Sequence, residues 1–362
     1  MSMVIETEKW VYHPGDVVRG YVHVVFDKPI KVRGIYVSFE GREHAAVTRG
    51  SGKNRHTYIQ NVMIVQDTIN VCSPGEDGTV GPCDVQYPFD FRIPVAAMPT
   101  LDSPFEYNLS GEALSKGIGH TVPSRLNGYI RYMIHAKVDR PFAIDINAKQ
   151  FVSVKIPPRS DVSIQPVSFT SHDDREQLRV DITINKNIYA PGEVVTGEAM
   201  FQRNPQKAVR AVEVILKFLV SITAQGRTDV YKQFADDIRF PVEPGTESMQ
   251  GVFSLATFTG GPISVPGHIV KLEWIVEVKV DLPGKIDKHV YVPVWVIPLT
   301  SEISLSGGQA FAVQGIGWHI EQGNPAETES GESSWQIDAD VDTPPSEPDS
   351  NPEEDAFWER EP

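Results

Sequence analysis

The sequence predicts an all-β protein with two immunoglobulin-like antiparallel β-sandwich domains in tandem and a disordered acidic C-terminal tail. Three observations lead to this prediction: apolar residues alternate with period two, one motif occurs twice, and the composition changes sharply after residue 300. Long helical periodicity is nearly absent, and Pro-Gly pairs separate the alternating runs. Many strands joined by such turns favour sandwiches.

Five stretches show the alternation most clearly. In the first, Val18, Val22 and Val24 fall on one face, and Arg19 and His23 fall on the other. The same pattern occurs within 35–40, 131–138, 178–184 and 272–280. Because successive side chains of a strand point to opposite faces, we expect each stretch to bury one face and expose the other.

A motif near the N-terminus recurs 177 residues later. Tyr12 to Gly20 reads Y-H-P-G-D-V-V-R-G, and Tyr189 to Gly197 reads Y-A-P-G-E-V-V-T-G. A later stretch also recurs, since the alternating run that begins at Tyr132 matches the run that begins at Trp274. A period this long indicates a duplicated domain, because solenoid repeats span only about 20–50 residues.

The Pro-Gly pair inside each motif has a structural interpretation. Proline presets φ at the second position of a turn, and glycine accepts the positive φ that a type II turn needs next. The Asp or Glu that follows can accept local backbone N–H groups. The prolines Pro157 and Pro158 mark the boundary between halves, so the predicted domains cover 1–157 and 161–300, followed by a tail at 301–362.

The net charge of −15 is unevenly distributed. Residues 321–362 contain 14 Asp and Glu and one basic residue, Arg360, which leaves 34 acidic and 32 basic residues in 1–320. A nearly neutral body has no electrostatic footprint for nucleic acid, and the acidic tail would repel phosphate backbones and anionic lipid. A tail rich in Glu, Asp, Ser and Pro cannot bury enough apolar surface to order itself.

No residue pattern indicates catalysis, a metal site or a cofactor. The ten histidines show no H-x-H or H-E-x-x-H spacing, and no G-x-S-x-G motif occurs. Cys72 and Cys83 flank a loop-like run, for which we expect two free thiols, with a disulfide across the hairpin as the alternative. Gly50 to Asn54 lacks the first glycine of a phosphate loop, so we expect an ordinary turn.

Two sandwiches in series, each opened by Y-x-P-G-[DE], resemble the arrestin fold, and the order of the matching pieces is similar to that of the alpha-arrestins, the arrestin-domain-containing proteins. Further matching pieces are Lys31 to Arg33, Tyr87 to Pro94, Gly128 to Tyr132 and Val280 to Gly284. The resemblance implies a non-enzymatic adaptor that binds the cytoplasmic tails of membrane receptors or transporters and recruits ubiquitin ligases or coat proteins. It also implies a cytoplasmic location, with association at the plasma membrane or endosomes.

Two alternatives remain open at this point: a structural subunit of a sorting complex, as in retromer, and a non-endocytic regulatory protein of the same fold. Two features also depart from the family pattern. Family members usually recruit ligases through P-P-x-Y motifs, whereas here Glu347 stands where the tyrosine would follow Pro344 and Pro345. The segment 106–126 is longer than the usual turn and is a candidate for a small ordered insertion.

Several residues are candidates for partner contacts. Arg49, Lys53 and Arg55 lie close together in the sequence, and such cations form charge-assisted hydrogen bonds with acidic or phosphorylated cargo tails. The alternative is a solvated hairpin tip whose charges contribute little. By resemblance, Lys9 on the first strand is another candidate, and a strand-edge lysine that prevents aggregation is its alternative.

The tail contributes the remaining candidates. Phe357 and Trp358 stand within an acidic stretch near the end of the chain. Acidic segments with aromatic residues are typical of linear motifs that bind a groove or add a strand. Together with Pro344 and Pro345, these residues are the predicted recruiting elements of the tail, and an inert solubilising segment is the alternative.

Overall fold

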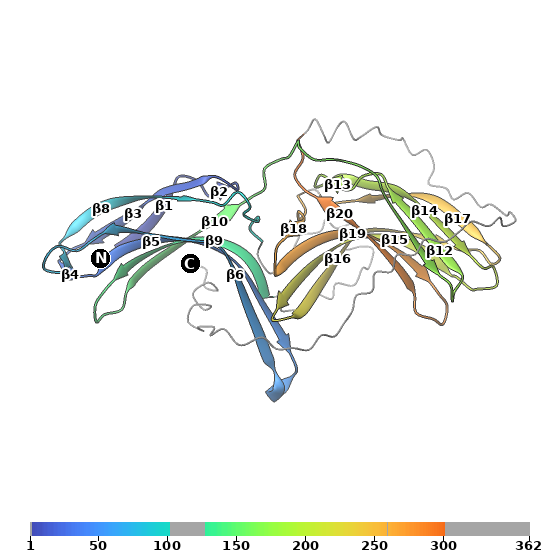
Figure 1. Ribbon diagram of the computed structural model, residues 1–362, viewed down its shortest axis with the longest axis horizontal. Helices are drawn as coiled ribbons and strands as arrows, with labels where there is room; N and C mark the ends of the chain where they lie inside the picture. The colour runs from blue at the N-terminus through green and yellow to red at the C-terminus, as the bar shows by residue number, and fades with distance from the viewer. Residues whose placement is uncertain (1, 102–126, 259, 301–362) are drawn as a thin grey trace. The chain divides into compact units, whose positions relative to one another are not determined.

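The computed structural model describes residues 2–101, 127–258 and 260–300, all of which lie within one compact unit, Met1–Glu321. These residues form 20 strands and one short 3-10 turn, η1 (Gly52–Asn54) (Figure 1). Among them, only the pairings β2–β10 and β13–β20 are parallel, and all other strand pairings are antiparallel. No helix in the described ranges has the length and apolar character that crossing a membrane requires.

The first half forms a small sheet of order β1-β3-β8 and a larger sheet of order β2-β10-β9-β5-β6. Its strands are β1 (Ser2–Thr7), β2 (Val11–Tyr12), β3 (Val17–Phe26), β5 (Gly34–Arg49), β6 (His56–Cys72), β8 (Cys83–Arg92), β9 (Asn127–Asp139) and β10 (Ile146–Val154), with a ribbon of β4 (Ile30–Lys31) and β7 (Thr79–Val80). The two larger sheets pack face to face, as Phe39 of β5 stacks on Phe91 of β8 with ring centroids 5.9 Å apart.

The second half repeats this arrangement. Its sheets have the orders β11-β12-β14-β17 and β13-β20-β19-β15-β16, with β18 pairing to β19. Its strands are β11 (Val167–Asp173), β12 (Leu178–Ile184), β13 (Ile188–Tyr189), β14 (Val194–Arg203), β15 (Ala211–Ala224), β16 (Arg227–Pro241), β17 (Ser248–Ala256), β18 (Val265–Pro266), β19 (Val270–Asp281) and β20 (Lys288–Val296). The order of the larger sheet is the same in both halves, strand for strand, as expected for a duplication.

The alternating stretches bury one face, which confirms the predicted all-β sandwich fold. Val18, Val22 and Val24 of β3 are completely buried, whereas Arg19 between them is exposed. Strand β12 shows the same alternation, whereas β9 and β19 are buried on both faces over much of their length, and Trp274 at the start of the later repeat is fully buried. Burial of these apolar faces supplies the main stabilisation of each sandwich.

The repeated motif forms the same turn in both halves. Gly15 and Gly192 have φ values of +89° and +87°, which a residue with a side chain rarely adopts. The carboxylate that follows each glycine accepts a backbone N–H three residues earlier, from His13 to Asp16 at 3.0 Å and from Ala190 to Glu193 at 2.8 Å. The acidic residue therefore closes the turn, as its position in the motif predicts.

The last glycine of the motif is required by close packing. A Cβ atom at Gly20 would lie 2.1 Å from the Glu6 carbonyl oxygen and 2.7 Å from the Phe89 ring. The equivalent Gly197 is covered in the same way by Phe253, with its ring 2.6 Å from the added atom. Both halves thus press an aromatic ring onto a strand glycine, which explains why this position is glycine twice.

Two predictions fall outside the described residues: the insertion at 106–126 and the tail at 301–362. The boundaries predicted for the two domains stay predictions. Cys72 and Cys83 are both free thiols in the structure.

Candidate partner-binding site

The hairpin of β5 and β6 extends beyond the rest of its sheet (Figure 1). Strand β9 accompanies β5 only as far as the pair Ala46 and Asn127. Strand β6 continues to pair with β5 for three more residues, up to Arg49 and His56. The end of the hairpin therefore has no third strand beside it among the described strands of its sheet.

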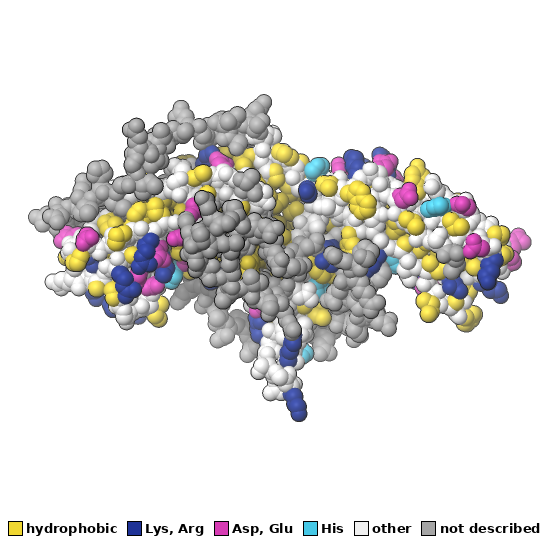
Figure 2. All heavy atoms as spheres, turned by 180° about the vertical axis from the view of Figure 1, so that it is seen from behind, with side chains coloured by type: hydrophobic (Ala, Val, Ile, Leu, Met, Phe, Trp, Pro, Cys, Tyr) yellow, Lys and Arg dark blue, Asp and Glu magenta, His cyan; other side chains and the backbone are white. Residues whose placement is uncertain are grey.

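The tip of this hairpin is a glycine turn that carries two exposed cations. Gly50 and Gly52 have φ values of +78° and +57°, and a Cβ atom at Gly50 would lie 2.2 Å from the Asn54 carbonyl oxygen. The turn needs glycine for its backbone geometry, which agrees with the ordinary turn expected for Gly50 to Asn54 in place of a phosphate-binding loop. Lys53 and Arg55 are exposed, and Figure 2 shows basic side chains on the projecting tip.

Arg49, the third predicted cation of this stretch, contacts the second half of the chain. Its Nη1 donates to Asp229 Oδ1 at 2.6 Å, and its Nη2 donates to the Thr228 carbonyl oxygen at 2.8 Å. The side chain is 42% exposed, so the ion pair is partly hydrated. The structure therefore separates the three cations: Lys53 and Arg55 face solvent, while Arg49 anchors the hairpin to β16.

The turn between β15 and β16 braces the hairpin from the side. The Arg227 guanidinium lies 3.7 Å from the centroid of the Tyr58 ring, a cation–π contact. The Gln225 backbone N–H donates to Gln60 Oε1 at 2.8 Å, and its side-chain amide donates to the Ile59 carbonyl oxygen at 3.2 Å. These contacts fix the direction of β6, because they hold both its backbone and its side chains.

Deeper in the same region, a buried carboxylate from β5 binds the turn before β19. Glu43 has no exposed surface. Its Oε1 accepts the His268 backbone N–H at 3.1 Å and faces the His268 ring Nδ1 at 2.9 Å. Its Oε2 accepts the N–H groups of Ile269 at 2.9 Å and Val270 at 3.3 Å. Three consecutive backbone donors thus converge on one carboxylate.

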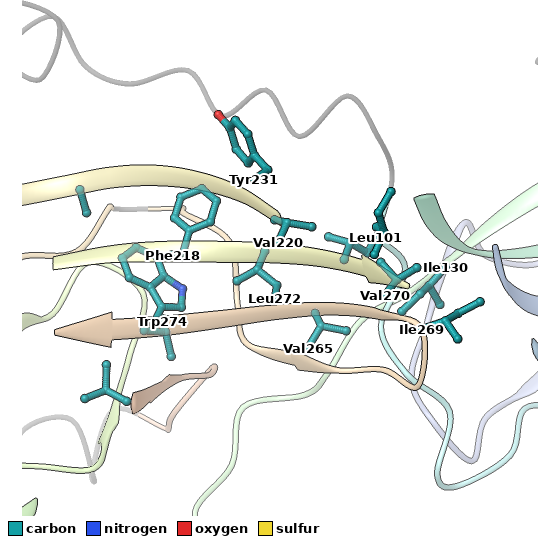
Figure 3. Close-up of a cluster of buried hydrophobic side chains, with 14 of the residues drawn as sticks. Leu101, Ile130, Phe218, Val220, Tyr231, Val265, Ile269, Val270, Leu272 and Trp274 are labelled. Atoms are coloured by element: carbon teal, nitrogen blue, oxygen red, sulfur yellow. The ribbon is translucent and has the colours of Figure 1, made fainter. Parts of the chain in front are cut away.

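Apolar side chains of the two halves meet at the same turn. Figure 3 shows Leu101 and Ile130 of the first half beside Ile269 and Val270 of the second half, all of them buried. A Cβ atom at Gly128 would lie 2.5 Å from Ile222 Cγ2, so the two chain segments approach as closely as a glycine allows. Because Glu43 is fully buried, its carboxylate supplies the hydrogen-bond acceptors that these backbone N–H groups need.

A second buried ion pair lies on the outer face of the larger sheet in the second half. Lys217 of β15 binds Glu277 of β19, with 5% and 4% of the side chains exposed, and His289 Nδ1 lies 2.5 Å from the other Glu277 oxygen. Burial acts to raise the pKa of the Glu277 carboxyl, but Lys217 and His289 outweigh it and lower that pKa. The described residues contain no group of three or more His, Cys, Asp or Glu placed to hold a metal ion.

Comparison with known proteins finds similarity to one protein family. Residues 1–158 match the arrestin (or S-antigen) N-terminal domain. Over 300 residues the chain is 22% identical to arrestin domain-containing protein B of Dictyostelium discoideum. Residues 1–158 are therefore similar to an arrestin N-terminal domain, and the chain as a whole is similar to this relative. The alignment covers 80% of the chain but 44% of the relative, so the chain spans less than half of the relative's length.

The structure corrects the placement of one further candidate residue. Lys9 does not lie on the first strand, because β1 ends at Thr7 and Lys9 occupies the exposed turn that leads to β2. Its backbone N–H donates to the Tyr12 hydroxyl at 3.2 Å, which fixes the turn. Within the described residues, no hydrogen bond or ion pair links Lys9 to Arg49, Lys53 or Arg55.

The tail candidates, Pro344, Pro345, Phe357 and Trp358, lie outside the described residues. Residues that sequence reasoning missed are Glu43 and its partner turn at 267–270. The sequence carries no clear signal, because Glu43 stands between Arg42 and His44, and a glutamate within a polar stretch of a strand usually faces solvent. Only its 0% exposure identifies it as a structural carboxylate.

Proposed function

We propose that this protein is a non-enzymatic adaptor that binds anionic segments of membrane-protein cytoplasmic tails at the tip of the β5–β6 hairpin. The observation that supports the proposal is the pair of exposed cations, Lys53 and Arg55, on a hairpin whose base is held by Arg49 and Tyr58. A braced tip loses less conformational entropy on binding than a free loop would. Lysine and arginine form charge-assisted hydrogen bonds with carboxylate and phosphate groups.

The proposal further assigns recruitment to the tail. Pro344, Pro345, Phe357 and Trp358 are the residues proposed to bind trafficking or ubiquitination machinery, in the cytoplasm and at the plasma membrane or endosomes. Support comes from the acidic, aromatic-containing composition of 321–362, which is typical of linear motifs. Similarity to the arrestin family supports the adaptor role in general terms, since arrestin proteins are generally adaptors without catalytic activity.

Fluorescence anisotropy with a synthetic acidic phosphopeptide tests the first part. The double variant Lys53→Ala/Arg55→Ala should weaken binding about tenfold, since two exposed charge-assisted contacts contribute roughly 1–2 kcal/mol together. The matched control is Lys28→Ala/Lys31→Ala, which removes two exposed cations at and just before β4, elsewhere in the first half. Equal binding by the two double variants would refute the tip as the cargo site.

Proximity labelling in cells, with the full chain and with a chain that ends at residue 320, tests the second part. The shortened chain should retain membrane-protein neighbours and lose coat proteins or ubiquitin ligases. Identical sets of neighbours would show that the tail recruits nothing. A stable stoichiometric complex that survives sizing chromatography would instead favour a structural subunit of a sorting complex.

A further inference from the structure

The turn between β9 and β10 exposes two large apolar side chains at the end of the first sandwich. Phe142 is 105% exposed, and Ile144 is 89% exposed. No other large apolar residue in the described part of the chain is as exposed as Phe142. Exposed single apolar residues are common on protein surfaces, but two on one six-residue turn form a local apolar tip.

The backbone at Phe142 is unfavourable for its side chain. Its φ is +58°, in the left-handed region, where a bulky residue is rare and costs energy relative to glycine. The second half of the chain has the same turn between β19 and β20, and there the equivalent residue is Gly284 with φ +71°. Folding alone therefore favours glycine at this position, and the phenylalanine adds no packing in return.

The two turns are otherwise built alike. In the first, the Arg140 backbone N–H donates to Asp145 Oδ1 at 2.9 Å, and in the second the Leu282 N–H donates to Asp287 Oδ1 at 3.1 Å. An exposed isoleucine precedes each aspartate, and Ile286 in the second turn is 87% exposed. The shared scaffold shows that the phenylalanine is an addition to a common turn rather than part of what shapes it.

The polar groups at the base of the Phe142 turn are already satisfied within the protein. Lys137 pairs with Asp145 at 2.9 Å, and Arg33 pairs with Asp139 at 2.9 Å. The Arg140 guanidinium donates to the Ile144 carbonyl oxygen at 3.2 Å. The tip can therefore leave water without depriving these groups of hydrogen-bond partners, which is the condition for entry into a lipid interface.

We propose that the β9–β10 turn inserts Phe142 and Ile144 into the interfacial region of a lipid bilayer. A bilayer fits these side chains better than a protein groove, because they project from a narrow tip and leave no flat apolar surface around them for a rigid partner. The paired charges at the base and the acidic tail argue for apolar insertion rather than attraction to anionic lipid. Two side chains support weak, reversible binding, because full burial of each contributes only about 1.5–3 kcal/mol.

Flotation of the full-length protein with phosphatidylcholine vesicles tests this proposal. The protein should float with the vesicles, and Phe142→Gly should reduce vesicle affinity about tenfold because the apolar ring is lost. The same substitution should leave the melting temperature unchanged or slightly higher, since glycine tolerates the positive φ. Damage to the fold would instead lower both the vesicle affinity and the melting temperature, so the two measurements distinguish lost insertion from lost stability.

The matched control is Val95→Ser, which removes an apolar side chain that is 82% exposed at the opposite end of the strands and should leave flotation unchanged. Phe142→Trp should retain binding, and the fluorescence it adds to the wild-type signal should be quenched by brominated phosphatidylcholine. Failure of the wild type to float, equal flotation of Phe142→Gly, or no quenching would overturn the proposal. The vesicles contain no cargo peptide, so this result is independent of the proposed cargo site.

Discussion

Replacing Glu43 with alanine removes the acceptor for three consecutive backbone N–H groups and for the His268 ring. The donors belong to His268, Ile269 and Val270, and they lie 2.9–3.3 Å from the carboxylate oxygens. Glu43 is completely buried, so water does not reach these donors in the wild-type structure. We expect Glu43→Ala to destabilise the protein much more than a typical surface substitution.

The magnitude follows from the unsatisfied donors. Each buried N–H that loses its partner costs at least about 1 kcal/mol, so three of them give about 3 kcal/mol. At an unfolding entropy of about 2.1 cal/mol/K per residue, and with about 300 residues unfolding together, that loss lowers the melting temperature by about 5 °C. Glu43→Gln keeps one acceptor oxygen and exchanges the other for an amide nitrogen, which cannot accept from the N–H groups it would face. The glutamine variant should therefore fall between alanine and the wild type.

Urea denaturation and differential scanning calorimetry of the full chain measure these changes. Glu6→Ala is the control, since the same substitution at an exposed position of β1 should change stability by no more than about 0.5 kcal/mol. Equal stability of Glu43→Ala and Glu6→Ala would refute the assignment of Glu43 as the acceptor that satisfies this turn. A glutamine variant less stable than the alanine variant would refute the order expected from the acceptor count.

Three further predictions concern the sandwiches. Gly197→Ala should cost about 1–3 kcal/mol in urea denaturation, because its Cβ would lie 2.3 Å from the Thr183 carbonyl oxygen, whereas Gly81→Ala, in open space, should cost almost nothing. Lys217→Met should lower the free energy of unfolding by about 3–5 kcal/mol, because it leaves the Glu277 carboxylate buried and poorly paired. The double variant Lys217→Met/Glu277→Met should recover much of that loss. If the effects of the two single substitutions simply add in the double variant, the pairing is contradicted. Burial lowers the pKa of His135, so between that pKa and about 6.5 the unfolded chain binds a proton that the folded chain does not. The free energy of unfolding should therefore fall as the pH drops below about 6.5. His135→Gln should make melting curves measured over this pH range depend less on pH.

The fold could be predicted from local pattern because period two is a property of the strand itself. Val18, Val22 and Val24 lie on one face in any extended strand, and the structure buries all three. The repeat also predicted that the two halves are built alike. Tyr12 and Tyr189 end the equivalent strands β2 and β13, which pair in parallel with β10 and β20. Glycine turns were also readable, because only glycine adopts the φ values seen at Gly15 and Gly192 without cost.

The site was only partly predictable. Nearness in sequence suggested that Arg49, Lys53 and Arg55 act together, and the hairpin does place Lys53 and Arg55 on one exposed tip. Arg49 instead pairs with Asp229, 180 residues away, a contact that no local pattern indicates. The placement of Lys9 on a strand was wrong, because β1 ends at Thr7. Lys9 lies in the turn that follows, where its backbone N–H donates to the Tyr12 hydroxyl.

The sequence by itself therefore determined the class of fold, the duplication and the uneven charge, since each depends on residues that are neighbours in the chain or recur at a fixed spacing. Tertiary structure alone decided which charges are structural and which are exposed. Glu43 and Arg49 are ordinary polar residues of one strand in the sequence, and their partners lie 180 or more residues further along the chain. No sequence pattern pointed to Phe142 either, because its exposure and its positive φ exist only once the turn has formed. Burial and long-range hydrogen bonding give these side chains their roles, and neither is a property of local sequence.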